Sequence, residues 1–203
     1  MQLAEVLIAV CLGVSLAAAA GFRVFVPLFV ISLAIASGHV TPGPSLAWLG
    51  SPLACLLLGV ATVVEIAGYF VPWVDNLLDS IASPAAVVAG TIAAAAATGQ
   101  ITNIDPVLQW SFGIIAGGGT AGVVQATTVA TRAASTLVSG GVANPVVSTT
   151  EAAAATTLSI LALAVPVIAA ALVIGALVFF FRLWRRRRTV PAASVEPTSI
   201  PSL

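Results

Sequence analysis

Apolar stretches separated by short polar or proline-rich segments make up most of the chain. The first runs from about residue 3 to 37, and Arg23 is the only charge in it after Glu5. One straight helix of that length would measure roughly 50 Å, which exceeds the ~30 Å hydrocarbon core of a bilayer. The stretch is therefore predicted to fold back at Gly21, as a tight transmembrane hairpin or as a re-entrant pair of half-helices.

Proline, serine and glycine mark the next two predicted helices. Residues 38–52 are rich in proline and glycine, which predicts a loop. Ser51 suits the N-cap of a helix that runs from residue 52 to about residue 70 and contains Glu65. A second helix is predicted over residues 84–99, where an alanine-rich sequence favours close packing against other helices.

An acidic segment lies between these two helices. Asp75 and Asp79 are four residues apart and Asn76 follows the first of them, while Tyr69 and Trp73 lie just before. We interpret the segment as a solvated turn at the membrane surface, with the two aromatic residues in the interfacial belt. A cation site is the alternative, because one helical turn would place both carboxylates on one face.

The second half of the chain follows a similar plan. An apolar segment from residue 105 to 116 is predicted to break at the glycines of residues 117–119 and to continue as a helix to about residue 139. A loop over residues 140–145 leads to a long apolar span predicted from about residue 152 to 181.

Each half thus contains a glycine-broken apolar segment, then an arginine, then a span with a glutamate. We predict two weakly repeated halves, residues 1–82 and 105–188, joined by the helix of residues 84–99. Broken helices in corresponding halves, with a site at their interface near the midplane, are typical of secondary transporters.

Composition identifies the bilayer as the solvent of this chain. Hydrophobic residues make up 60% and charged residues 7%, whereas about a quarter of the residues in soluble domains are charged. The fold class is therefore predicted as all-α and polytopic, with about five to six hydrophobic helical segments in one transmembrane domain over residues 1–188. Five arginines follow the last apolar stretch, at 182 and 185–188, so the positive-inside rule places the C-terminus in the cytoplasm. Residues 189–203 are predicted to be a disordered cytoplasmic tail.

Four charges lie within the predicted membrane region: Arg23, Glu65, Arg132 and Glu151. Each costs at least about 2.5 to 3.5 kcal/mol at the bilayer centre, so such groups are expected to face the bundle interior and to pair with one another. Two interpretations of these four charges are open. They form structural ion pairs that fix helix register, or they form a functional polar site.

A polar stripe supports a site at Arg132. Gln125, Thr128, Arg132 and Ser135 follow spacings of three, four and three, which place them on one helix face toward a partner or cavity. A break before this helix would expose the amides of Gly118, Gly119 and Thr120, which suit an anion. Packing surfaces are the alternative interpretation of the glycines.

The two glutamates differ in their local sequence. Ser148 and Glu151 fit a capping box, in which each side chain accepts from the other's backbone N–H. Glu65 is mid-span and has no cap role, so it is a candidate counter-charge or proton site. Glu151 is the second candidate for that role.

Four short segments carry a family resemblance: VPWVDNLLD, IIAGGG, the segment around Arg132, and NPVVSTTE. Together they resemble the small bacterial integral membrane proteins grouped as domain of unknown function 4126, over nearly all of the chain up to the arginine cluster. The resemblance implies a multi-pass protein of the bacterial plasma (inner) membrane and no particular activity. The family-like positions are Asp75, Asn76, Asp79, Gly118, Arg132, Asn144, Pro145, Ser148 and Glu151. An acidic residue often follows the glutamate in that family, whereas Ala152 stands here, which argues against a role for paired carboxylates.

Enzymatic motifs are absent from the sequence, which has no HExxH, no cysteine–histidine arrangement and no GxxxxGK[ST]. We expect no catalytic residue, no metal, no cofactor and no nucleic-acid partner. The expected partners are membrane lipids, a small anionic ligand and a second copy of the chain.

Two hypotheses about function follow. The first is a small transporter or channel-like protein in which Arg132 and Arg23 bind an anionic solute or lipid head group. The second is a non-transporting scaffold whose buried charges are structural ion pairs.

Overall fold

The computed structural model describes residues 2–188, except for the side chains of Gln2, Pro72, Trp73, Asp75, Asn76, Trp184 and residues 186–188. Every regular element in this range is a helix, which confirms the predicted all-α fold. In order they are α1 (Gln2–Phe22), α2 (Phe25–Ala36), η1 (Pro44–Gly50), α3 (Pro52–Gly68), α4 (Pro72–Thr98), α5 (Pro106–Phe112), η2 (Gly113–Gly118), α6 (Gly119–Ser139), α7 (Asn144–Ala164) and α8 (Pro166–Arg188). The predicted tail of residues 189–203 lies outside the described residues.

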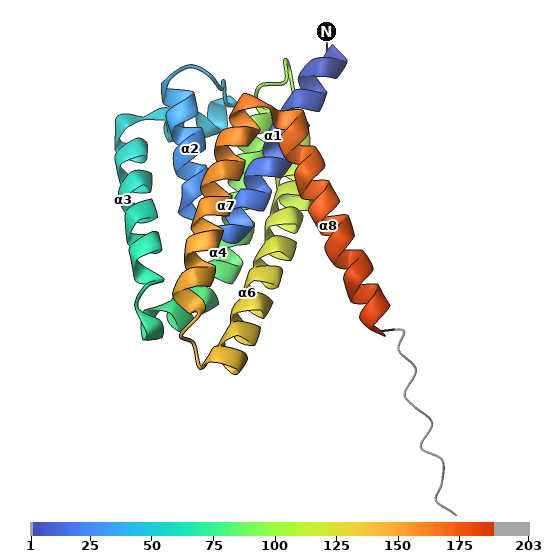
Figure 1. The fold of residues 1–203 in the computed structure, drawn as a ribbon. Coiled ribbons are helices and arrows are strands. Elements are labelled where there is room, and N and C mark those ends of the chain that lie inside the picture. The colour runs from blue at the N-terminus through green and yellow to red at the C-terminus, as the bar shows by residue number, and fades with distance from the viewer. Residues whose placement is uncertain (1, 189–203) are drawn as a thin grey trace, which may run out of the picture.

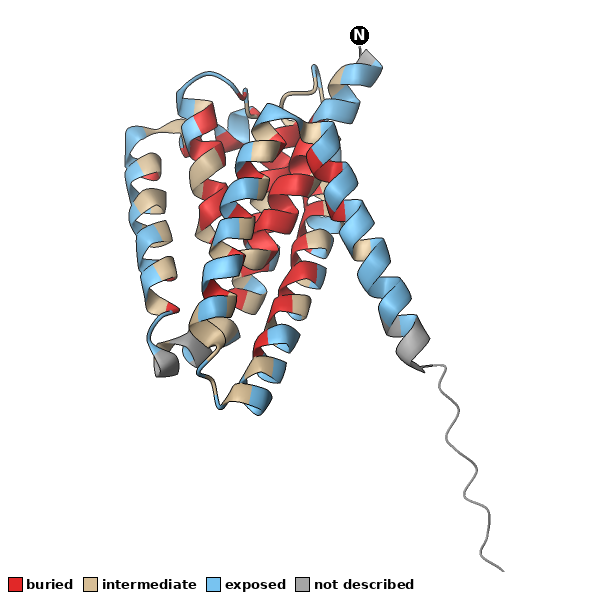
Figure 2. Cartoon of the chain, viewed as in Figure 1, coloured by how far each residue is buried: buried red, intermediate tan, exposed pale blue. Residues whose placement is uncertain are grey.

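The helices form one bundle, in which α1, α2, α3, α4, the continuous α5–η2–α6 span, α7 and α8 run in alternating directions (Figure 1). Helix α1 lies at its centre, in contact with α4, α6, α7 and α8. Leu16 and the alanines of residues 17–20 on α1 are at most 1% exposed, and the alanines of residues 93–97 on α4 are fully buried. Small side chains thus let the central helices approach closely, and the buried positions gather there (Figure 2).

The predicted fold-back of the first apolar stretch is confirmed. Helix α1 ends at Phe22, and α2 begins at Phe25 and returns along the bundle (Figure 1). Helix α2 has 12 residues, about 18 Å, so it is too short to cross the hydrocarbon core by itself. Gly21 lies just before the link, and a Cβ there would be 2.6 Å from the carbonyl oxygen of Ala121 on α6. The glycine therefore allows α1 and α6 to touch at the point where the chain turns.

The break predicted at residues 117–119 is not present. The segment Gly113–Gly118 is a π-helical stretch, and Pro106–Ser139 is continuous enough to count as one 34-residue span. Gly117 and Gly118 pack against α4 instead, and a Cβ on Gly117 would lie 2.5 Å from the carbonyl oxygen of Gly90. The alternative interpretation, that these glycines form a packing surface, therefore describes them better. The π-helical turn, which is wider than an α-helical one, keeps the span continuous.

Two other predicted boundaries were wrong because proline acted differently from expectation. The helix expected over residues 84–99 is the later part of the 27-residue α4, which contains Pro84 and also includes the expected acidic turn. The span expected over residues 152–181 is two helices, α7 and α8, that run in opposite directions. Val165 has φ −144° and ψ 72°, as the residue before a proline avoids helical geometry, and Pro166 begins α8.

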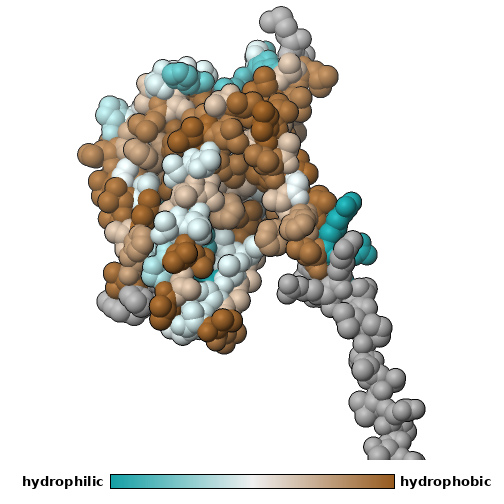
Figure 3. All heavy atoms as spheres, viewed as in Figure 1, coloured by the Kyte–Doolittle hydropathy of each residue, from teal (hydrophilic) through white to brown (hydrophobic). Residues whose placement is uncertain are grey.

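Within the described residues, five helices are long and apolar enough to cross a membrane, and there are six if the bent pair of η1 and α3 is one span. These numbers confirm the predicted five to six segments. Ser51 caps α3 as predicted, because its side chain accepts from the Ala54 amide at 3.2 Å. The visible outer face is mostly apolar (Figure 3), and the protein is a multi-pass helical membrane protein.

Candidate functional site

The four intramembrane charges are buried together. Arg23 is 1% exposed, Arg132 is 3% exposed, and Glu65 and Glu151 are each 6% exposed. Arg23 lies in the α1–α2 link and Arg132 in α6, while Glu65 lies in α3 and Glu151 in α7. With three side chains that contact them, they form what we name the charge cluster: Arg23, Glu65, Tyr69, Asp79, Arg132, Ser148 and Glu151.

Arg132 is held by two carboxylates. Its Nε donates to both oxygens of Glu151, at 3.2 and 3.1 Å, and its Nη2 donates to Oε2 of the same residue. Its Nη1 lies 3.7 Å from Oδ1 of Asp79, which is 18% exposed. Arg132 is therefore neutralised from α7 and α4, as expected for a charge in the bundle interior.

Arg23 is only partly satisfied. Its Nη2 donates to the carbonyl oxygen and the hydroxyl of Ser148, at 2.9 and 2.6 Å, and lies 3.3 Å from Oε2 of Glu151. Its Nε and Nη1 are buried and have no hydrogen-bond partner within the part of the chain that the structure describes. A buried donor without a partner costs about 1–3 kcal/mol, and more for a charged group, so this side chain is suited to an added acceptor.

Glu65 caps the helix that follows the fold-back. Its two carboxylate oxygens accept from the backbone N–H groups of Val24 and Phe25, at 2.7 and 3.0 Å. The link between α1 and α2 frees these amides at the positive end of α2, and a carboxylate there is stabilising.

The capping roles of the two glutamates are thus the reverse of the sequence interpretation. Helix α7 begins at Asn144, so Ser148 and Glu151 lie within it and the predicted capping box does not form. The Ser148 side chain instead accepts a hydrogen bond from Arg23, and the Glu151 side chain accepts from Arg132.

Tyr69 is part of the charge cluster and was missed as a site residue. It is 4% exposed, so the predicted place in the aromatic belt was wrong. The Cζ atoms of Arg23 and Arg132 lie 3.7 and 4.2 Å from the centre of its ring, within the range of cation–π contacts. Its spacing of four residues from Glu65 at the end of α3 was the signal that could have identified it.

The polar stripe of α6 is buried as predicted along most of its length. Gln125 is 4% and Thr128 is 6% exposed, and the Thr128 hydroxyl donates to the Gln125 carbonyl oxygen at 2.9 Å. Ser135 is half-buried, and its Oγ finds no hydrogen-bond partner among the residues described.

The amide site predicted at Gly118, Gly119 and Thr120 does not form, because no helix begins there. A Cβ on Gly118 would lie 2.8 Å from Oγ1 of Thr91 on α4, so this glycine is a packing position. Of the acidic segment, Asp79 reaches Arg132, whereas the side chains of Asp75 and Asn76 lie outside the described residues. No three metal-ligating side chains lie together in the part of the chain that the structure describes.

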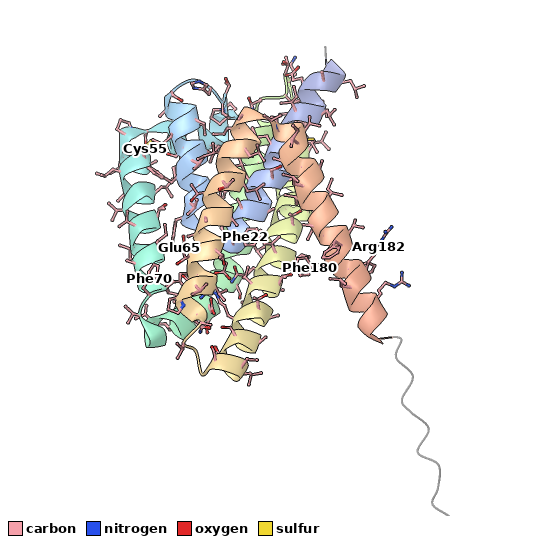
Figure 4. All side chains as sticks on the ribbon, in the orientation of Figure 1. Phe22, Cys55, Glu65, Phe70, Phe180 and Arg182 are labelled. Atoms are coloured by element: carbon pink, nitrogen blue, oxygen red, sulfur yellow. The ribbon has the colours of Figure 1, made fainter. Side chains whose placement is uncertain are left out.

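The charge cluster lies toward one end of the bundle. Arg132 precedes the end of α6 at Ser139 by seven residues (139 − 132), about 10 Å along the helix. Figure 4 labels Glu65 toward that end of α3, the end at which α8 carries Arg182. The cluster contains two guanidinium groups and three carboxylates, which give it a formal charge of −1.

Comparison with known proteins gives a family and no activity. The family described as domain of unknown function 4126 matches residues 10–186. No curated protein and no solved structure matches the chain. Because the match extends over most of the sequence and includes every member of the charge cluster, the chain belongs to the family of domain of unknown function 4126.

Proposed function

We propose that this protein is a small membrane transporter that binds an anionic group at Arg23. The observation that carries the proposal is the pair of buried guanidinium nitrogens, Nε and Nη1, without a hydrogen-bond partner among the described residues. Arg132 was the first candidate from the sequence, but Glu151 and Asp79 already neutralise it. Arg23 is the arginine with donors to offer, and it lies beside a break between helices, where transporters commonly bind their substrates.

Charge balance suggests that a proton accompanies the anion. The cluster already has a formal charge of −1, so a bound anion would add a second uncompensated charge to a low-dielectric site. Protonation of Glu65 or Glu151 would offset that charge, in keeping with their role as counter-charge or proton site. We propose binding and transport without covalent chemistry, in the bacterial inner membrane with the C-terminus in the cytoplasm.

A flux measurement tests the proposal. The purified protein is placed in liposomes that contain a pH-sensitive dye, and inorganic phosphate or succinate is added outside. Anion-driven internal acidification is expected for the wild type and is expected to be lost in Arg23→Gln. His39→Gln is the control, because it replaces an exposed polar side chain in the loop between α2 and η1, outside the charge cluster and α8.

A second measurement does not depend on the choice of anion. In a chain with Cys11→Ala and Cys55→Ala, Arg23→Cys is treated with a negatively charged, membrane-impermeant methanethiosulfonate. Labelling is expected if an aqueous path reaches this position, and Ala20→Cys, which is fully buried one turn earlier on α1, is expected to stay unlabelled. If Arg23→Cys remains as unreactive as Ala20→Cys from both sides of the membrane, the transporter proposal is wrong.

The scaffold hypothesis has its own support in Arg132. This side chain is buried and bound to two carboxylates, as in a structural ion pair. A chain without flux and without labelling at position 23, but with a stability that depends on these pairs, would favour the scaffold.

A further inference from the structure

A groove lies between the lower part of α8 and α6, outside the charge cluster. It has a volume of about 470 Å³ and is lined by Val123 of α6 and by Leu177, Val178, Phe181, Arg182 and Arg185 of α8. The five α8 positions follow helical spacing, so they form one face of that helix. The wall is apolar along most of its length and basic at one end.

The groove exists because α8 leaves the bundle. Val173 on the upper part of α8 is 6% exposed and packs with Val124 of α6 and Ala18 of α1, and Leu177 packs against the same cluster. Toward its C-terminal end α8 leans away from α6 (Figure 1), and Phe181 of this part of α8 is 55% exposed. Within a bilayer the space between two diverging helices is filled by lipid chains.

The basic end of the groove selects the kind of lipid. Arg182 and Arg185 are both exposed and are three residues apart, so their guanidinium groups lie on the same side of α8. Figure 3 shows hydrophilic atoms on this part of α8 beside an apolar surface. Guanidinium groups match phosphate geometry, and each basic residue near the membrane surface favours anionic lipid.

We infer that this groove binds one anionic phospholipid, with an acyl chain along Val123, Leu177 and Val178 and its phosphate at Arg182 and Arg185. A zwitterionic lipid is a poorer occupant, because its own cationic group offsets the phosphate. A second copy of the chain is also poorer, because copies inserted in the same direction would bring two arginine-rich helix ends together.

Native mass spectrometry of the purified protein tests this inference. The protein is mixed with equal amounts of phosphatidylglycerol and phosphatidylcholine of identical acyl chains. We expect about tenfold more retained phosphatidylglycerol in the wild type, and about equal retention of the two lipids in Arg182→Gln/Arg185→Gln.

A groove-filling pair separates this site from general lipid contact. Val123→Trp fills the groove without a change in charge and is expected to lose most of the retained phosphatidylglycerol. Val63→Trp is the matched control, because Val63 is 67% exposed on α3 and lies outside the groove. Thermal unfolding in detergent confirms that both variants are folded.

Three results would overturn the inference. They are equal retention of the two lipids by the wild type, unchanged phosphatidylglycerol in a folded Val123→Trp, and a dimer that Val123→Trp dissociates. The last would assign the groove to a second copy of the chain.

Discussion

The residues of the charge cluster stabilise one another to different degrees. Glu151 contacts both arginines, whereas Glu65 contacts neutral backbone amides. Removal of one partner of a buried ion pair leaves the other charge uncompensated. The loss of stability on replacing a carboxylate is therefore expected to be larger where its partner is charged than where its partner is a neutral amide.

Neutralising the two glutamates is expected to have unequal effects. Glu151→Gln removes the carboxylate to which Arg132 donates from Nε and Nη2, and is expected to lower the free energy of unfolding by about 3 kcal/mol. Glu65→Gln retains one amide oxygen for the α2 N-terminus and is expected to cost about 1 kcal/mol. Unfolding of the purified variants in detergent measures both, and an equal loss would contradict the assignment of Glu65 as a cap.

A double-mutant cycle is expected to reveal the ion pair itself. Arg132→Met should destabilise strongly, because it leaves Glu151 without its bidentate partner, while Arg132→Met with Glu151→Leu should recover part of the loss. A coupling energy of about 1–3 kcal/mol between the two positions is expected from thermal unfolding. If the loss of stability in the double variant equals the sum of the losses in the two single variants, Arg132 and Glu151 do not form a stabilising pair.

At the scale of elements, glycines set the distance between α4 and the α5–η2–α6 span. Gly90 and Gly117 face one another so closely that neither position has space for a Cβ. Gly119, two residues later, has no heavy atom within 4 Å of where a Cβ would lie. The same glycine run thus contains one tightly packed position and one open position.

This difference gives a matched pair of substitutions. Gly117→Ala forces a methyl group to within 2.5 Å of the Gly90 carbonyl oxygen and is expected to cost about 1–3 kcal/mol through overpacking. Gly119→Ala fills open space inside a helix and is expected to be neutral or slightly stabilising. Melting temperatures of the two variants provide the test, and a lower value for Gly119→Ala than for Gly117→Ala would refute this packing argument.

At the scale of the whole molecule, the two ends of the described chain lie at opposite ends of the bundle (Figure 1). The arginine-rich end of α8 is expected to lie on the cytoplasmic side, and the start of α1 on the other side. A fluorescent protein fused to the C-terminus should therefore fluoresce in bacterial cells, whereas alkaline phosphatase fused there should be inactive. The opposite pattern would reverse the proposed orientation.

The sequence by itself determined the solvent, the helical class and the approximate number of spans, because these depend on local composition and on helix length. It also located the four intramembrane charges and the stripe of α6, since periodicity is a local property. The family resemblance, now confirmed over residues 10–186, rested on short motifs that the sequence carries directly.

Tertiary structure decided which of these groups meet and what each proline or glycine does. Pro84 is tolerated within α4 whereas Pro166 separates two helices, and the glycines before α6 are packing positions whose role depends on α4. Arg23 and Ser148 are separated by 125 residues, so no local pattern could pair them. The exchange of roles between Glu65 and Glu151 has the same cause, because a carboxylate in a membrane binds the nearest unpaired donor, and only the packed bundle fixes which donor that is.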